Sequence, residues 1–229
     1  MRHLMCALVC LLSTCAILAA PAPADRPWLT GWDKPVDPDN DCKFTRDKGT
    51  LTIEVPGKDH DLAVERNLMN SPRLLRDVEG DFVAQVRASG TFLPSQESTS
   101  TERLPFVGAG LLLMADEKTY VRLERAALRL QGEVRTYANW ELRQDGNWVL
   151  AGDASVQPLE DKATYLRLQR QGDKLLPSVS HDGKDWKELN PLEINLPSKL
   201  KLGVSGGGTS TDVFAPRFDQ FRLKQEKGK

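Results

Sequence analysis

Polar and apolar residues alternate along two segments of the chain, and this alternation is typical of β-strands. Residues 120–125 (YVRLER) and 165–170 (YLRLQR) both place an apolar residue at every second position. Successive side chains of a strand point to opposite faces of a sheet. We therefore expect Val121, Leu123, Leu166 and Leu168 to face a core. The polar faces of these strands would carry Tyr120, Arg122, Glu124, Tyr165, Arg167 and Gln169.

Short strand-like segments recur between turn signals through most of the chain. Residues 107–114 form a nearly continuous apolar run, which is typical of a central strand. Residues 139–150 predict a hairpin that turns at Asp145-Gly146, and residues 213–223 predict a closing strand with a bulge or bend at Pro216. About a dozen such segments predict an all-β fold, a two-sheet antiparallel jelly-roll sandwich.

Three segments depart from the simple strand pattern. Residues 61–70 favour one helical turn or a short helix, and residues 124–131 contain good helix formers within what we predict to be a kinked strand. Residues 94–105 are small and polar between two prolines. That composition predicts a mobile surface loop with nothing to bury.

The N-terminal residues predict a secretory signal peptide. Arg2 and His3 precede an apolar run over residues 4–20, and Ala22-Pro23-Ala24 fits the small-residue cleavage rule. We expect cleavage after Ala24, which leaves a single domain over residues 25–229 with no membrane-spanning segment. This predicts a secreted or periplasmic protein. The alternatives are a retained anchor and lipid attachment at Cys15, although Thr14 departs from the lipidation pattern.

Charge and cysteine usage exclude several classes of protein. The chain has 31 basic and 32 acidic residues, and this balance argues against a nucleic-acid partner. Three of the four cysteines lie in the predicted signal peptide, so only Cys42 remains after cleavage. One cysteine forms neither an internal disulfide nor a cysteine-only metal site. We expect Cys42 to be a buried apolar residue.

Seven short motifs, taken in order, resemble a family of secreted bacterial proteins of unknown function. They are DPDNDC (37–42), HDL (60–62), PRLL (72–75), GDF (80–82), GAGLL (108–112), RLER (122–125) and SHDGKDW (180–186). The family is grouped with a yeast protein described as a regulator of enolase. It is similar to the concanavalin A-like lectin and glucanase superfamily, so the resemblance implies a jelly-roll sandwich. It implies no catalytic residues.

Two segments carry residue types that bind metals. The Asp37–Asp41 segment places three acids at alternate positions, as at the start of a calcium loop. Cys42 and Lys48 stand where an EF-hand requires Gly and Glu, so that motif is rejected. We expect no cofactor, with a looser calcium site as the alternative. His60 lies between two aspartates, which favours a hydrogen-bonded loop histidine over a metal half-site or an acid–base pair.

The carboxylates do not follow the pattern of a hydrolase. Glucanases of this fold group their acids along one strand, and retaining hydrolysis needs two carboxyls about 5 Å apart. Glu124 is the only acid of its strand, and Arg122 on the same face is expected to lower its pKa. Such a group is a poor general acid, so we do not expect an enzyme.

Aromatic and charged residues on the polar strand faces predict a binding surface for sugars. Rings stack on sugar faces and planar polar groups bond hydroxyls, and Tyr137, Trp140, Trp148, Glu141 and Arg143 add to the available set. We predict a non-catalytic binding module for a carbohydrate or another cell-surface polymer. The predicted ligand contacts are Tyr120, Arg122, Glu124, Tyr165, Arg167, His60, Asp61 and Arg73. The alternatives are a glycan-active hydrolase with unconventional carboxylates and an envelope structural or protein-interaction domain, which an apolar patch would favour.

Overall fold

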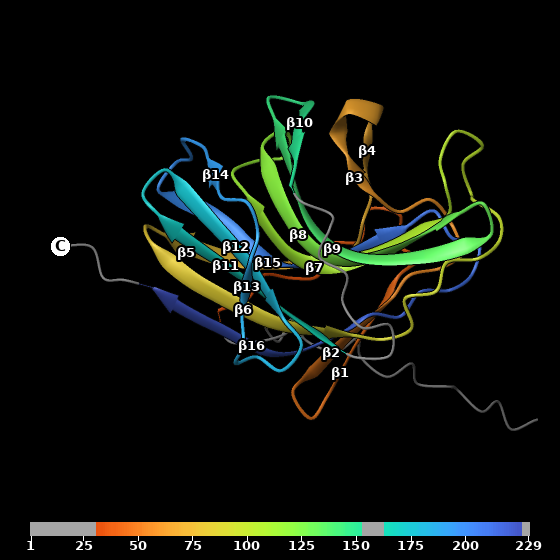
Figure 1. The fold of residues 1–229 in the computed structure, drawn as a ribbon, viewed down its shortest axis with the longest axis horizontal. Helices are drawn as coiled ribbons and strands as arrows, with labels where there is room; N and C mark the ends of the chain where they lie inside the picture. Colours follow the sequence, from red (N-terminus) through yellow and green to blue (C-terminus); the bar gives the residue numbers. More distant parts are fainter. Residues whose placement is uncertain (1–30, 153–162, 226–229) are drawn as a thin grey trace, which may run out of the picture.

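The computed structural model describes residues 31–152 and 163–225, which form two stacked antiparallel sheets (Figure 1). This confirms the all-β sandwich that the alternation predicts. The predicted signal peptide, residues 1–24, lies outside the described residues. Within the described ranges, no helix is long and apolar enough to cross a membrane.

One sheet has six strands and the other has eight. The six-stranded sheet runs β10 (Asn147–Ala151), β9 (Glu133–Gln144), β8 (Tyr120–Leu130), β7 (Phe106–Met114), β15 (Lys199–Gly208) and β5 (Arg73–Glu79). The eight-stranded sheet runs β1 (Lys43–Asp47), β2 (Thr50–Glu54), β16 (Arg217–Gln225), β6 (Phe82–Ser89), β11 (Thr164–Gln171), β12 (Lys174–Ser180) and β13 (Lys187–Glu188), with β14 (Leu192–Glu193) also on β12.

A small hairpin completes the fold. It joins β3 (Leu62–Ala63) to β4 (Leu68–Met69) through a 3-10 turn, η1 (Val64–Arg66). The expected helical turn in residues 61–70 is therefore this single turn. The hairpin and β10 rise from the same side of the six-stranded sheet, away from the eight-stranded one (Figure 1).

The core lies between the two sheets. Val121, Leu123, Leu166 and Leu168 are all buried in it, as their alternation predicts. Trp140 is a correction: its ring packs in the same core and its Nε1 donates to the Asn190 carbonyl at 2.8 Å. It faces inward because its register partner on β8 is the core residue Leu123, so it belongs to no outer binding face.

Tight turns set the register of the hairpins. Asp145 and Gly146 both have positive φ, at 53° and 81°, between β9 and β10. Two consecutive residues of this kind are typical of the type I′ turn, whose twist matches that of the flanking strands. Gln131 and Gly132 repeat the pattern between β8 and β9. The predicted 139–150 hairpin is confirmed.

Three local predictions are wrong. The closing strand β16 begins after Pro216, whose carbonyl accepts a hydrogen bond from the Ile53 nitrogen. The register shift of this strand lies further along, between Asp219 and Arg222, and not at Pro216. Strand β8 pairs with both neighbours without a register shift, so it has no bulge where a kink was expected.

The loop over residues 94–105 is the third correction, because part of it is buried. Ser95 is only 8% exposed. Its backbone nitrogen donates to the Ser210 hydroxyl at 3.0 Å, and the Arg129 guanidinium donates to its carbonyl. These hydrogen bonds fasten the loop beside the six-stranded sheet.

The fold predicts a contrast between two leucines. Leu123→Ala should lower the free energy of unfolding by about 2–5 kcal/mol, because it empties a fully buried position between the sheets. Leu93→Ala, at a 56% exposed position, should cost less than about 0.5 kcal/mol. Urea unfolding of both variants checks this. Equal losses would contradict the placement of Leu123 in the core.

Candidate functional site

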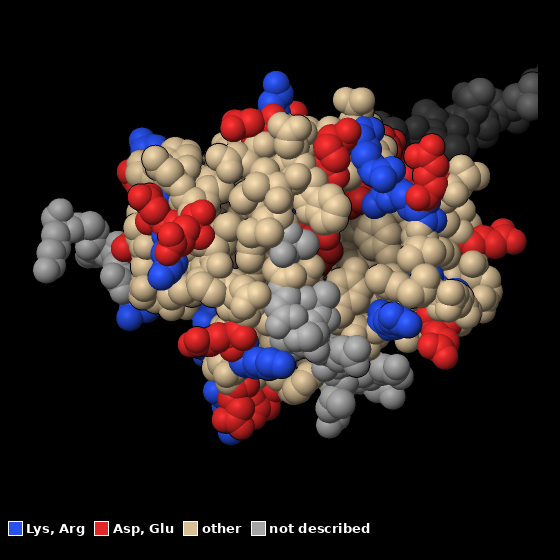
Figure 2. All heavy atoms as spheres, turned by 45° about the horizontal axis from the view of Figure 1, so that its top comes forward, with Lys and Arg blue, Asp and Glu red and all other residues tan. Residues whose placement is uncertain are grey.

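A pocket of about 300 Å³ opens on the outer face of the six-stranded sheet. Its floor comes from β7, β8 and β9, and its walls come from the β3–β4 hairpin, β10 and the end of the 94–105 loop. Figure 2 shows a hollow on this side, with acidic and basic side chains gathered along its rim. The lining residues are Asp61, Ala63, Glu65, Arg66, Arg103, Leu104, Phe106, Arg122, Glu124, Leu128, Tyr137, Glu141, Arg143 and Trp148.

Asp61 joins three separate segments at one side of the pocket. It is 2% exposed and accepts a hydrogen bond from Arg122 Nη1 at 2.6 Å and another from Arg103 of the loop. The Leu62 backbone nitrogen also donates to it, at 2.8 Å. Asp61 therefore holds strand β8, the loop and the β3–β4 hairpin together.

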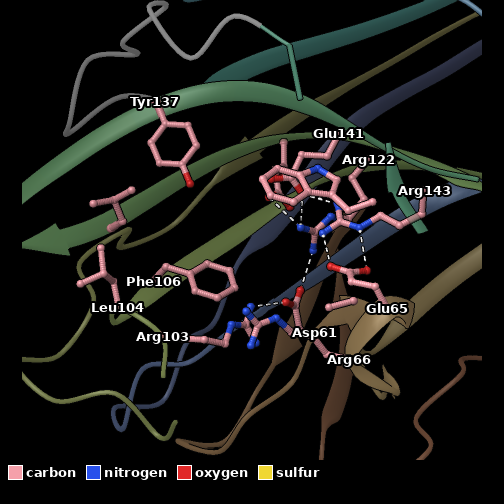
Figure 3. A pocket seen from close by; sticks show the side chains of 14 residues that line it. Asp61, Glu65, Arg66, Arg103, Leu104, Phe106, Arg122, Tyr137, Glu141 and Arg143 are labelled. Carbon is pink, nitrogen blue, oxygen red and sulfur yellow. Dashed lines mark hydrogen bonds and ion pairs between the residues drawn. The ribbon is translucent and has the colours of Figure 1, made fainter. Parts of the chain in front are cut away.

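Glu141 continues the ionic network along β9. It lies opposite Arg122 in the β8–β9 register, and its Oε2 accepts from both Arg122 and Arg143. Arg143 in turn pairs with Glu65 of η1, and Figure 3 shows these side chains converging at the hairpin side of the pocket. Acids and bases therefore alternate in the order Glu65, Arg143, Glu141, Arg122, Asp61. Arg103 extends the network, because its Nη1 also lies 3.3 Å from Asp59 Oδ1.

This network keeps two carboxylates ionised. Burial opposes the ionisation of Asp61, but Arg122 and Arg103 outweigh it and hold the pKa of Asp61 below its usual value. Burial likewise opposes the ionisation of Glu141, and Arg122 with Arg143 holds its pKa low. Both acids therefore act as fixed anions that orient the arginines.

Glu124 stands apart from the network, although it neighbours Arg122. Its Oε1 lies 3.8 Å from Arg122 Nη2, beyond hydrogen-bonding distance, whereas Nη1 donates to Asp61 and Nη2 donates to Glu141. The carboxyl leans over Gly108 of β7, where an added Cβ would lie 3.0 Å from Oε2. No residue in 31–152 or 163–225 donates a hydrogen bond to this carboxyl.

The environment of Glu124 reverses the pKa shift expected from the sequence. Burial raises the pKa of Glu124 to about 7. Arg122 offsets only part of this, and the nearby Glu141 and Asp61 add to the rise. The sequence predicts a lowered pKa because it shows the adjacency to Arg122, whereas it shows neither the burial of the carboxyl nor the two nearby acids.

The remaining wall of the pocket is aromatic and apolar. Tyr137 of β9 points its hydroxyl into the space between the lining side chains, across from Phe106 and Leu104 (Figure 3). Tyr137 lies opposite the small Ala126 on β8, which leaves room for the ring over the sheet. Trp148 of β10 is 58% exposed and lies at the rim, with the Arg143 guanidinium 5.8 Å from its ring centroid.

The pocket contains three of the eight predicted ligand residues, namely Asp61, Arg122 and Glu124. Tyr120 is buried, and its hydroxyl accepts from the Val64 nitrogen, so it supports η1. Arg73 is buried and donates to the carbonyls of Met69 and Ser71. His60 faces the other way, toward Asp41 at 2.9 Å.

Tyr165 and Arg167 lie on strand β11 of the eight-stranded sheet, in the other layer of the sandwich. The Tyr165 hydroxyl accepts from the Gln220 amide at 3.2 Å. Arg167 stacks on Trp186, with 3.6 Å from its guanidinium carbon to the ring centroid. The two alternating segments thus resemble each other in sequence but belong to different sheets.

Residues from irregular segments were missed by the sequence analysis. Glu65 comes from η1, while Arg103 and Leu104 come from the loop that was expected to be free. Periodicity carries no signal for such positions. The only indication in the sequence is that Arg103 is the one basic residue between Pro94 and Pro105.

The acidic segment before β1 makes hydrogen bonds within the protein. Asp37 Oδ2 accepts from the Cys42 backbone nitrogen at 2.9 Å, and Asp39 accepts from the Asn70 amide at 2.8 Å. Among the described residues, the set with metal-ligand atoms in mutual reach is Asp41, Cys42 and His60, all within 4.8 Å of one another.

Comparisons with known proteins relate this chain to others through structure. No model of a protein family and no curated protein matches the sequence. A functionally unknown protein from Saccharomyces cerevisiae superposes with a TM-score of 0.67 at 17% identity, over 87% of this chain and 98% of that one. A xylan β-1,4-xylosidase from Bacillus halodurans gives 0.64 at 16% identity, over 88% of this chain and 38% of the enzyme.

A carbohydrate-binding module and a lectin-like domain share the same architecture. The carbohydrate-binding module CBM66 from Bacillus subtilis superposes with a TM-score of 0.53 at 11% identity, over 87% of this chain and 99% of the module. A legume lectin-like domain from Entamoeba histolytica gives 0.55 at 11% identity, over 86% and 91% of the two chains. At such identities the likeness establishes the fold, which is a lectin-like β-sandwich.

The raised pKa of Glu124 predicts a pH-dependent cost to stability. A carboxyl whose pKa is raised in the folded state stabilises the protein below its ordinary pKa of 4.5, and this contribution is lost as the pH rises through about 7. Glu124→Gln keeps the shape without the charge. It should match the wild type near pH 4 and exceed its stability above pH 7 by roughly 3 kcal/mol.

Urea unfolding across this pH range measures the difference. Glu133→Gln, at an exposed position of the neighbouring strand, is the matched control and should show little pH dependence relative to the wild type. A Glu124→Gln difference that stays constant from pH 4 to 8 would contradict the raised pKa.

Proposed function

We propose that this protein is a secreted or periplasmic carbohydrate-binding domain and that the pocket on the six-stranded sheet takes a neutral glycan. The observation that carries the proposal is Glu124. It is a nearly buried carboxyl that faces the pocket while its neighbouring acids are all engaged with arginines. A sugar hydroxyl is a hydrogen-bond donor that such a carboxyl can bind.

The charge of the lining favours a neutral ligand. Four acids (Asp61, Glu65, Glu124, Glu141) and four arginines (Arg66, Arg103, Arg122, Arg143) line the pocket, so its formal charges balance when all are ionised. The arginines of the network already bind carboxylates. An anionic sugar would therefore compete with these carboxylates for the guanidinium groups. A neutral sugar can instead bind polar groups that face the pocket, such as the Glu124 carboxyl.

The apolar wall supplies the second half of sugar recognition. Phe106 and Leu104 face Tyr137 across the pocket (Figure 3), and Trp148 lies at its rim. Such surfaces pack against the C–H groups of a sugar ring, while the polar groups fix its orientation. The likeness to a carbohydrate-binding module and a lectin-like domain supports this reading through the fold. Export, inferred from the N-terminal residues, would bring the protein to extracellular polymers.

Binding to neutral polysaccharides tests the proposal directly. We expect the wild type to be retarded in native gels cast with a neutral polysaccharide, with xylan and fructan among the panel. Tyr137→Ala and Glu124→Gln should each weaken binding about tenfold or more, because each removes a group that faces the ligand. Tyr165→Ala, on the other sheet, is the matched control and should bind like the wild type.

The result that would overturn the proposal is equally specific. Circular dichroism first establishes that each variant is folded. If folded Tyr137→Ala and Glu124→Gln bind as tightly as the wild type, or if Tyr165→Ala loses binding to the same degree, the pocket is not the glycan site. An absence of binding across the panel would redirect the search to a protein ligand.

A second candidate function, glycan hydrolysis, is favoured by the same residue. A carboxyl with a pKa of about 7 can donate a proton at neutral pH, as a general acid must. Glu141 would supply the ionised carboxylate: its Oε2 binds two arginines, and no described residue hydrogen-bonds its Oε1. In this scheme Glu124 protonates the leaving oxygen, and Glu141 attacks the anomeric carbon or activates a water.

Release of reducing sugar ends separates catalysis from binding. If the protein is a hydrolase, the wild type releases ends with a rate that falls above pH 7, and Glu124→Gln lowers that rate by roughly 100-fold or more. Glu133→Gln, at an exposed position outside the pocket, serves as the control and should retain most of the activity. Glycan binding without any release of ends would reject hydrolysis and leave the binding function in place.

A further inference from the structure

A cluster of potential metal ligands lies outside the pocket, behind the segment that carries Asp61. The turn before β1 brings Asp39, Asp41 and Cys42 toward His60. His60 Nε2 lies 2.9 Å from Asp41 Oδ1 and 3.7 Å from Asp39 Oδ2, and Cys42 Sγ lies 3.7 Å from Asp41 Oδ1. Three potential metal ligands of three chemical kinds, Asp41, Cys42 and His60, therefore converge, and Asp39 approaches them on the His60 side.

These separations resemble those of a tetrahedral zinc site. Zinc binds nitrogen and oxygen at about 2.0–2.2 Å and sulfur at about 2.3 Å, so neighbouring tetrahedral ligands lie roughly 3.3–3.7 Å apart. The two 3.7 Å separations already match, and the 2.9 Å separation needs to widen by only a few tenths of an ångström. All ligand atoms of Asp41, Cys42 and His60 lie within 4.8 Å of one another.

His60 supplies an independent observation, because both of its ring nitrogens face oxygen acceptors. Nδ1 lies 3.3 Å from the Lys58 carbonyl, and Nε2 faces the two carboxylates. The ring is completely buried, and a neutral imidazole has one N–H and can satisfy only one of these directions. Either a second proton on the ring or a metal ion on Nε2, with Nδ1–H donating to the carbonyl, satisfies both directions. That arrangement is usual for a metal-bound histidine.

Residues outside the cluster also hold the carboxylates of Asp39 and Asp41. The Asn70 amide donates to Asp39 Oδ2 at 2.8 Å. The Lys58 ammonium binds Asp41 Oδ2 at 2.7 Å, which leaves Asp41 Oδ1 toward His60 and Cys42. Such outer partners orient ligands and increase metal affinity.

The backbone that carries His60 is fixed to a rigid sheet. The His60 nitrogen donates to the Gly208 carbonyl at 3.1 Å, and the Gly208 nitrogen donates back at 2.8 Å. Across the cluster, the Cys42 nitrogen is held by Asp37. Both sides of the cluster are thus preorganised, as a metal site requires.

From these contacts we infer that Asp39, Asp41, Cys42 and His60 form a binding site for a zinc-class divalent cation. The donor set selects the metal, because nitrogen and sulfur ligands suit zinc and cobalt, whereas calcium prefers oxygen alone. The local charge agrees, since two aspartates, Asp37 and Asp41, lie around the thiol and Lys58 pairs with only one of them.

Cobalt substitution tests the inference with a signal that reports the ligands. Co²⁺ added to the purified full chain should bind one ion per molecule and give a thiolate-to-cobalt absorption band together with tetrahedral bands in the visible. Zn²⁺ should displace the cobalt, abolish the bands and raise the Tm of the protein. Neither readout requires a known activity.

Ligand variants locate the ion. Cys42→Ser should remove the thiolate band, and His60→Gln should weaken binding by more than about 100-fold, since changes to outer partners alone cost about 10–100-fold. His181→Gln, in an exposed turn, is the matched control and should bind like the wild type. The wild-type spectrum decides the question even if a variant fails to fold.

Three outcomes would overturn the site. They are no cobalt or zinc binding by the folded wild type, binding without a thiolate band, and stabilisation by Ca²⁺ with none by Zn²⁺. A failure here leaves the glycan pocket untouched, because none of the four ligands lines it.

Discussion

The ion pair between Arg122 and Asp61 is the interaction on which the functional face depends. It joins the middle of strand β8 to the start of the β3–β4 hairpin, and through Arg103 it also holds the loop that closes the pocket. Ion pairs of this kind are expensive to desolvate, and removing one partner leaves an uncompensated buried charge. The pair therefore contributes geometry more than stability: it fixes three segments that the backbone alone does not bring together.

The same pair explains why Glu124 remains available to a ligand. The terminal nitrogens of Arg122 donate to Asp61 and Glu141, so the guanidinium is directed toward these two acids. Glu124 is left near a positive charge without a hydrogen bond from it, while burial and two neighbouring anions oppose its ionisation. The raised pKa of Glu124 thus arises from its burial beside two anions, which Arg122 offsets only in part.

Periodicity predicts the layers of this fold well, because side-chain alternation and sheet geometry share the same period of two. It places Leu123 and Leu166 in the core and Arg122 and Glu124 on an outer face, as found. It fails where positions depend on tertiary contacts. Arg103 lies in an irregular loop, and Tyr165 belongs to the other sheet although its segment resembles that of Tyr120. The predicted direction of the pKa shift of Glu124 is wrong for the same reason, since the shift depends on burial and on residues that are distant in the sequence.

The alternating chain of charges also constrains how this surface can change over evolutionary time. Each internal member of the series from Glu65 through Arg143, Glu141, Arg122 and Asp61 to Arg103 has two opposite neighbours. A single replacement within the series leaves the neighbours on both sides without an ion-pair partner. The resulting loss of stability therefore depends strongly on which other members have also changed. Such a surface should drift by coordinated exchanges rather than one residue at a time. Pairs such as Arg122 with Asp61 should then covary among relatives, while the exposed positions around them vary independently.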